Sequence, residues 1–244
     1  MSPALWEATA RAAGESTLRA AKTEAERLRM REAELRIGML EDAWRGALYA
    51  FMLRRYKSSD VVDSLSAVVS TEHNVFRRIM GELSTVYKWG ATRELEDADQ
   101  TQIATSLWDE AQIDETLDLA NLYLNALRDI ILVPRVVNGK MQVDVLSPEA
   151  LCVTQDPRDP SQALQWVNET SLVDTAGATQ IRREWATPME WIVTNQYGEE
   201  LERSEHGLGR MPGVVVHADK RTKAFFGISR GSDAVQANLN IGHD

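Results

Sequence analysis

The chain has 244 residues, of which 43% are apolar and 26% are charged, and its formal net charge is −10. These values are ordinary for a globular protein and exclude wholesale disorder, while the acidity argues against a protein that grips nucleic acid through a basic face. The same acidity is compatible with a surface past which DNA slides without adhering, because like charges repel. No apolar run reaches the roughly 20 residues of a membrane span, and residues 1–16 lack the pattern of a signal peptide.

Residues 1–57 predict a long N-terminal helix, which Gly14 or Gly38 could interrupt. Alanine, glutamate, arginine and leucine dominate this segment, and all four favour helices. Spacings of three and four residues predict one apolar stripe, made of Leu18, Ala21, Ala25, Leu28, Leu35 and Met39. Opposite charges four residues apart, such as Glu32 and Arg36, are expected on the exposed face. A helix this extended favours a role in an assembly.

Residues 58–129 predict the second helical part of the chain. Ser58-Ser59-Asp60 offers a helix cap, and the helical block VVDSLSAVVSTEHNVFRRIMGELSTVYKW follows it. The acidic residues 94–99 are interpreted as solvated helix faces and caps, because they lack the alternating ligands and central glycine of a calcium loop. A third helix is then predicted over residues 102–129.

Residues 130–219 predict an antiparallel β-rich part. ILVPRVVNGKMQVDVLSP reads as two strands joined by Asn138-Gly139, a strong hairpin signal. Pro148 ends the second strand, ALCVT predicts a short one, and residues 155–160 predict a turn. ALQWVNET, TQIRREWAT and MEWIVTNQ predict further strands, a last hairpin turns near Gly198, and GVVVHAD predicts the final strand.

Residues 220–244 predict a turn and the start of a helix that we expect to continue past Asp244. The order is therefore N-terminal helices, then an antiparallel β meander, then the start of a long helix. Because strands and helices do not alternate along the chain, this order predicts an α+β fold.

Residues 227–231, GISRG, fit the G-x-S-x-G pattern of a nucleophile elbow. A hydrolase elbow needs a parallel sheet, with an acid and then a histidine after the serine. Asp233 and His243 have the right order, but a helix rising about 1.5 Å per residue would place His243 roughly 20 Å from Ser229. The predicted sheet is also antiparallel. We therefore interpret these residues as a strand-to-helix turn, with Ser229 or Ser232 and Asp233 as helix caps, and the hydrolase as the disfavoured alternative.

No other pattern predicts a catalytic, cofactor-binding or metal site. The four histidines are His73, His206, His217 and His243, and none has a partner four residues later that would make a helical zinc pair. His206 and His217 flank the turn at 207–213 and could converge, but two ligands alone make a weak site. That turn lacks the Lys-Ser/Thr of a phosphate loop. Cys152 is the one cysteine, which excludes an intrachain disulfide, and its apolar surroundings predict a buried side chain. The prediction is a protein with no cofactor and no enzymatic activity.

Two stretches resemble tailed-bacteriophage portal proteins. The first is NLYLNALRDIILVPRVVNGKMQVDVLSPEALCVTQDPRDPSQALQW. In this stretch a helix ends in a strand, a small hairpin follows, and a short proline-containing segment introduces another strand and an acidic turn. The second is GLGRMPGVVVHADKRTKAFFGISRGSDAVQANLN, with a Gly- and Pro-led strand, a short loop and a G-x-S turn that opens a helix. The block VVDSLSAVVSTEHNVFRRIMGELSTVYKW is similar to the helices that precede this region in portals. The resemblance covers residues 60–244 and leaves the N-terminal helix unmatched.

The resemblance implies a structural subunit of a homo-oligomeric ring, typically a dodecamer, at one capsid vertex. Double-stranded DNA would be packaged and ejected through the ring without sequence-specific binding. The implied partners are the major capsid protein, the terminase and the head–tail connector proteins, with assembly in the host cytoplasm, a final place in the virion and no membrane. The matching part would be the N-terminal portion of the wing, and a stem would follow residue 244. The alternative is another virion or scaffold-type assembly protein without enzymatic activity.

Overall fold

A computed structural model describes residues 24–41, 60, 74–85, 93, 95–173, 179–220 and 224–226. Its helices are α2 (Glu24–Leu40), α5 (Val75–Leu83), α6 (Ala98–Glu110) and α7 (Ile113–Leu127). Its strands are β1 (Asp129–Val137), β2 (Lys140–Leu146), β3 (Leu151–Gln155), β4 (Ala163–Val173), β5 (Thr179–Ala186), β6 (Glu190–Thr194), β7 (Glu200–Glu205) and β8 (Val214–His217). Helices followed by antiparallel strands confirm the α+β prediction, and the predicted last helix lies outside the described residues.

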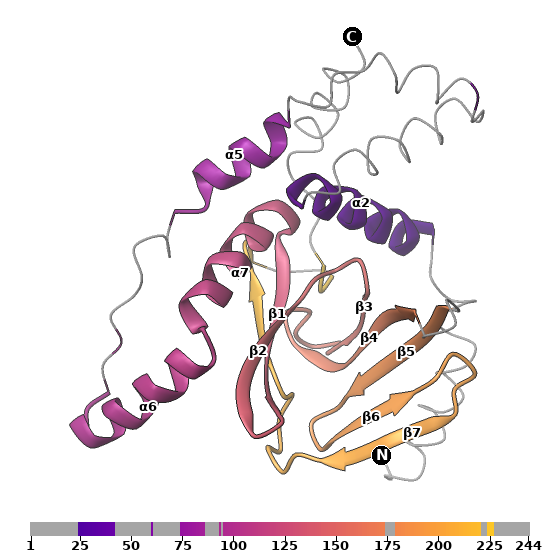
Figure 1. The fold of residues 1–244 in the computed structure, drawn as a ribbon. Coiled ribbons are helices and arrows are strands. Elements are labelled where there is room, and N and C mark those ends of the chain that lie inside the picture. Colours follow the sequence, from indigo (N-terminus) through magenta and orange to yellow (C-terminus); the bar gives the residue numbers. More distant parts are fainter. Residues whose placement is uncertain are drawn as a thin grey trace.

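The strands form two antiparallel sheets (Figure 1), a three-stranded sheet of order β2-β1-β8 and a five-stranded sheet of order β3-β4-β5-β6-β7. The five-stranded sheet is a meander, because each strand pairs with the next one along the chain. β8 does not extend that meander. It pairs with β1, where Asp129 lies opposite His217 and Leu132 lies opposite Val214. The last described strand therefore returns to the first one.

The hairpins form where turn residues predict them. Asn138 and Gly139 have φ values of 53° and 77°, so both central residues are left-handed. This is the geometry of a type I′ turn, whose twist matches that of the flanking strands. Gly198, with a φ of 84°, serves the turn between β6 and β7.

The third predicted helix, over residues 102–129, is wrong as a single element. α6 ends at Glu110, and α7 begins at Ile113. Gln112 between them is left-handed, with φ 48° and ψ 47°, which ends the repeating helical hydrogen bonds. Asp114 in the first turn of α7 favours a new N-terminus there, because the positive end of the helix dipole attracts a carboxylate. In Figure 1, α6 extends away from the two sheets.

The helical block predicted after residue 60 is not continuous either. Asn74 has φ −81° and ψ 78°, outside the helical region, and its side chain accepts a hydrogen bond from the backbone N–H of Arg77. The Asn74 side chain also donates to the carbonyl of Met39, 2.5 Å away. Asn74 therefore starts α5 as a cap and ties it to the end of α2.

Helix α2 corrects several expectations about the N-terminal segment. The long helix predicted over residues 1–57 is not continuous, because α2 ends at Leu40 and Glu41 is a bend. α2 runs through Gly38 to Leu40, so Gly38 does not interrupt it. Met39 is fully buried as the predicted stripe requires, but Leu28 is 54% exposed. Arg36 was expected on the exposed face, and it is instead only 1% exposed. Its ion pair with Glu32 does form, with 2.7 Å between the charged atoms.

Two apolar clusters hold the described residues together. The helical cluster joins α2, α5 and α7 through Ala33, Met39, Leu40, Phe76, Met80, Ala126 and Leu127. The sheet cluster contains Ile131, Val133, Leu146, Leu151, Ala163, Trp166, Ala186 and Phe225. At its centre Trp166 is fully buried and meets Trp191 edge-on, with 6.3 Å between ring centroids. Trp166 connects the two sheets.

Candidate functional site

The nucleophile-elbow residues lie outside the described part of the chain. This applies to residues 227–231 with Ser229, and also to Asp233, His73 and His243. The nearest described residue upstream is Phe226. Just before it, the backbone N–H of Phe225 donates to the side-chain oxygen of Gln155, 2.8 Å away. The interpretation of residues 227–231 as a strand-to-helix turn stays a prediction.

His206 and His217 are each held by partners of their own. Nδ1 of His217 lies 2.8 Å from an Asp129 carboxylate oxygen, and its Nε2 lies 3.2 Å from the Ser161 carbonyl oxygen. Nε2 of His206 lies 2.9 Å from the carbonyl oxygen of Thr187. Within the described ranges, no group of three or more metal-ligating side chains comes together. Both histidines therefore link strands and turns, and the structure does not join them into one ligand set.

Cys152 lies on β3 opposite Val167 of β4. Its side chain is half-buried, so the prediction of a buried cysteine is right only in part. Among the helices that the structure describes, none is long and apolar enough to cross a membrane.

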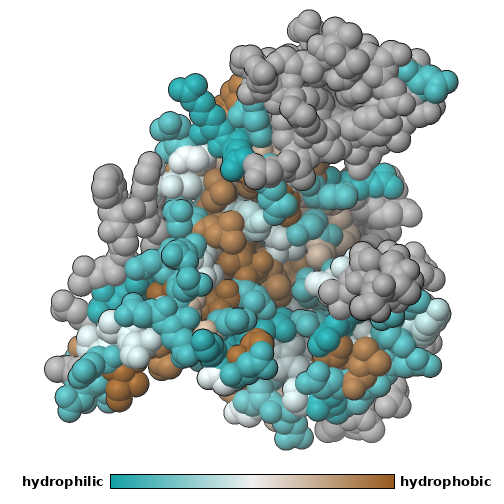
Figure 2. All heavy atoms as spheres, viewed as in Figure 1, coloured by the Kyte–Doolittle hydropathy of each residue, from teal (hydrophilic) through white to brown (hydrophobic). Residues whose placement is uncertain are grey.

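A cleft of about 460 Å³ opens between α7, β2 and β4. Its apolar walls come from Leu119 on α7 and from Val143 and Val145 on β2. Leu119 is 43% exposed, which is high for a leucine beside a packed sheet. Figure 2 shows hydrophobic surface gathered in the middle of this face, over α7 and the neighbouring strands. The cleft therefore presents apolar groups to whatever enters it.

The charged residues that line the cleft are both carboxylates. Asp144 and Glu149 line it, and the described lining residues include no lysine, arginine or histidine. Asp144 is neutralised by Arg135, with 2.7 Å between the charged atoms. Glu149 accepts a 2.5 Å hydrogen bond from the hydroxyl of Ser147. Burial raises the pKa of Glu149, and this hydrogen bond opposes the rise.

Tyr123 and Glu41 extend the acidic character at one end of the cleft. The hydroxyl of Tyr123, which lines the cleft, donates to a Glu41 carboxylate oxygen 2.9 Å away. Burial raises the pKa of Tyr123, and the bond to Glu41 raises it further. The Glu41 charge also raises the pKa of Glu149.

Glu149→Gln is expected to raise the melting temperature at pH 8 by a few degrees and to change it little at pH 4. Burial raises the folded-state pKa of Glu149 above its ordinary value of 4.5. Its stabilising contribution is therefore present below the unfolded-state pKa and lost as the pH rises through the folded-state pKa. Glutamine still accepts from Ser147 but cannot ionise. Thermal unfolding of both chains across this pH range measures the effect, and a difference that stays constant with pH would contradict it.

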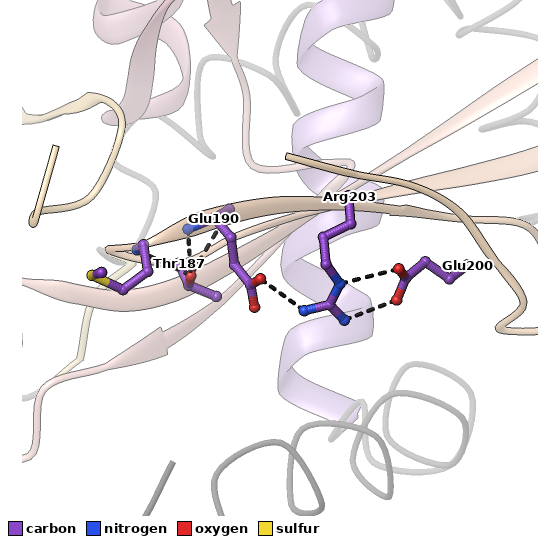
Figure 3. A network of polar contacts seen from close by, with 5 residues as sticks. Thr187, Glu190, Glu200 and Arg203 are labelled. Atoms are coloured by element: carbon purple, nitrogen blue, oxygen red, sulfur yellow. Dashed lines mark hydrogen bonds and ion pairs between the residues drawn. The ribbon is translucent and has the colours of Figure 1, made fainter. Parts of the chain in front are cut away.

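The opposite edge of the five-stranded sheet carries a charged network (Figure 3). The Arg203 guanidinium of β7 donates a bidentate pair of hydrogen bonds to the Glu200 carboxylate, at 3.0 and 2.8 Å. It also donates a hydrogen bond of 2.7 Å to the carboxylate of Glu190 on β6. The contact with Glu200, and after it the one with Glu190, raises the pKa of Arg203. Every residue of β7 is exposed. A short, charged edge strand discourages other strands from pairing with it, so this edge is a poor docking surface.

Neither a scan against models of protein families nor a search of curated proteins returns a match to this chain. The family of this chain is therefore not shown by comparison.

Proposed function

We propose that this chain is a structural subunit of a portal-type ring at one vertex of a tailed-bacteriophage capsid. The observation that carries the proposal is the pairing of β8 with β1. The first stretch that resembles portals contains β1, and the second contains β8. Their strands are joined in register, with Ile131 opposite Val215. Both stretches that resemble portals therefore contribute neighbouring strands to one sheet.

The charge of the chain supports a role beside DNA that must move. A net charge of −10 repels phosphates, so DNA can pass through a channel built from such subunits without adhering to its wall. In this role double-stranded DNA is packaged and later ejected through the ring. The subunit needs no catalytic site, and its partners are the capsid protein, the terminase and the connector proteins. Assembly takes place in the host cytoplasm, and the finished ring belongs to the virion.

Electron microscopy of the purified full-length gene product tests the proposal. Negatively stained particles are expected to be rings with a central channel, and sedimentation velocity is expected to give one large species. A product that stays monomeric at high protein concentration contradicts a ring subunit.

A further inference from the structure

Strand β2 has a free edge that carries unpaired backbone groups. It is the outermost strand of the three-stranded sheet, so only its side toward β1 is paired with a strand. The two-residue turn at 138–139 makes Val137 and Lys140 a hydrogen-bonded pair. Because the pairing alternates along an antiparallel ladder, the N–H and C=O groups of Met141, Val143 and Val145 are directed away from β1.

Hydrogen bonds on the other side of β1 agree with this assignment. The Ala218 N–H donates to the Arg128 carbonyl at 2.9 Å, so the even-numbered residues of β1 bond to β8 and the odd-numbered ones bond to β2. Odd-numbered residues of β1 lie opposite even-numbered residues of β2. Outside the ladder with β1, no backbone hydrogen bond between described residues involves Val143 or Val145. Their outward-directed groups are therefore available to another strand.

The cleft between α7, β2 and β4 exposes this edge. Asp144 pairs with Arg135, which also bonds to Glu184 of β5, so Asp144 points toward the five-stranded sheet. Val143 and Val145 point to the opposite face of β2, because side chains alternate along a strand. All three residues line the cleft, which therefore wraps around the edge of β2. Its two walls are α7 and β4.

A buried amide on β4 faces the same space without a partner. Asn168 is only 8% exposed and lines the cleft. No described residue donates a hydrogen bond to its side chain or accepts one from it. Buried polar side chains normally have a partner, and an amide can both donate and accept. The Asn168 side chain is therefore matched to another amide that enters the cleft.

Three other free edges of the two sheets are protected against strand addition. β7 carries the exposed charged network around Arg203. The part of β1 beyond its pairing with β8 contains Pro134, which has no N–H to donate. On β3, the carbonyl oxygen of Leu151 already accepts a hydrogen bond of 3.2 Å from Arg29. The outward-directed residues of β2 have none of these features, and an unprotected edge is a template for another strand.

We propose that the free edge of β2 binds an extended peptide segment of a partner protein as an added antiparallel strand. The backbone groups of the segment would pair with those of Val143 and Val145. Its residues opposite these two valines would be apolar, because they meet the Leu119 side of the cleft. Its residue opposite Asp144 would carry an amide, because it meets Asn168. The inference goes beyond the proposed ring subunit and does not depend on it.

The walls of the cleft select a lone segment over a second copy of this chain. An entering strand must be uncovered on both faces, because α7 lies on one side of the edge and β4 lies on the other. The β2 strand of a second copy carries its own α7 and β4 at the same places. Two copies joined edge to edge through β2 would bring these elements into the same space, whereas an extended segment without covering layers enters freely.

N-methylated peptides test the backbone pairing on the unsubstituted full-length chain. The probe is a blocked peptide of valine, asparagine and valine, flanked at each end by a threonine and a terminal lysine. One isomer is N-methylated on both valines and the other on both threonines. In an antiparallel strand opposite Val143 and Val145, the valine N–H groups face β2 and the threonine N–H groups face away.

The parent peptide is expected to bind in isothermal titration calorimetry. Methylation of the valines is expected to weaken binding by about tenfold or more, because it removes two hydrogen bonds, and methylation of the threonines is expected to leave it nearly unchanged. Equal binding of the two isomers overturns strand addition, and the reverse order overturns the antiparallel orientation. A parent peptide that does not bind at millimolar concentration overturns the proposal.

Val143→Pro tests the same contact from the side of the protein. Proline removes an N–H that the β1–β2 ladder does not use, so the variant is expected to fold and to bind the parent peptide about tenfold or more weakly. Val143→Thr is the matched control, since it keeps the N–H and the branched side chain, and it should bind as before. Equal binding of both variants overturns backbone pairing at this position. If Val143→Pro instead abolished self-association of the chain, a neighbouring copy would be the occupant and the partner protein would be overturned.

Discussion

Gly213→Ala is expected to destabilise the fold by about 1–3 kcal/mol, the usual cost of an added methyl group in a filled core. A Cβ atom at Gly213 would lie 2.9 Å from the carbonyl oxygen of Leu132 and 2.9 Å from the Trp166 ring. Neither neighbour can move easily, since Leu132 belongs to the backbone of β1 and Trp166 is fully buried. The start of β8 would have to shift away from β1. Urea unfolding followed by tryptophan fluorescence measures the loss.

Gly81→Ala is the matched control, because it makes the same chemical change in the interior of α5. No atom lies within 4 Å of a Cβ built there, and alanine stabilises a helix interior by about 0.5–1 kcal/mol relative to glycine. The two variants should therefore change the free energy of unfolding in opposite directions. Equal effects would mean that β8 does not approach Trp166 as closely as described.

Most of the β-rich part could be predicted because its turns are encoded locally. Asn138-Gly139 adopts the left-handed geometry that these two residues favour, and Gly198 does the same at the next predicted hairpin. Strands joined by such turns must pair with their neighbours. This rule accounts for the pairing of β1 with β2 and of β6 with β7.

The pairing of β8 with β1 could not be predicted in the same way. Alternation of apolar residues shows which side of a strand is buried, but it does not identify a partner that is distant in sequence. Val215 lies opposite Ile131, and no turn connects the two strands. The break between α6 and α7 was also hidden, because the apolar pattern continues through Gln112, a residue with no special preference for the left-handed region.

The cleft was missed because three separate elements build it. Leu119 reads in the sequence as one more apolar residue of a helix, and Glu149 reads as a polar residue after a proline. Only the packing of α7 beside β2 and β4 makes them neighbours across one surface.

Arg36 shows why a pattern of charges does not decide which residues are exposed. The last carbonyl groups of a helix lack partners within it and must find other donors. Ala126 is in the last turn of α7, and the Arg36 guanidinium donates to its carbonyl oxygen at 2.7 Å. A charged side chain is therefore drawn into the helical cluster to complete the end of another helix.

Arg36→Ala is expected to destabilise the fold by about 2–4 kcal/mol. It leaves the Ala126 carbonyl without this donor, which costs about 1–3 kcal/mol in a buried place, and it opens a cavity beside Phe76. Glu32 is 34% exposed, so water can solvate its carboxylate once the ion pair is lost. The loss of stability is therefore smaller than the loss caused by leaving a fully buried charge without its partner. Urea unfolding measures the difference from the unsubstituted chain.

Arg36→Met and Arg203→Ala separate the causes of that loss. Methionine fills most of the volume and restores the packing but not the hydrogen bond, so it should recover only part of the stability. Arg203 has ion pairs as short as those of Arg36, but its side chain is 35% exposed. Its removal should cost less than about 1 kcal/mol, because water competes for exposed ion pairs. If Arg36→Ala cost no more than Arg203→Ala, the carbonyl at the end of α7 would not depend on the guanidinium, and the buried position of Arg36 would have to be explained by packing alone.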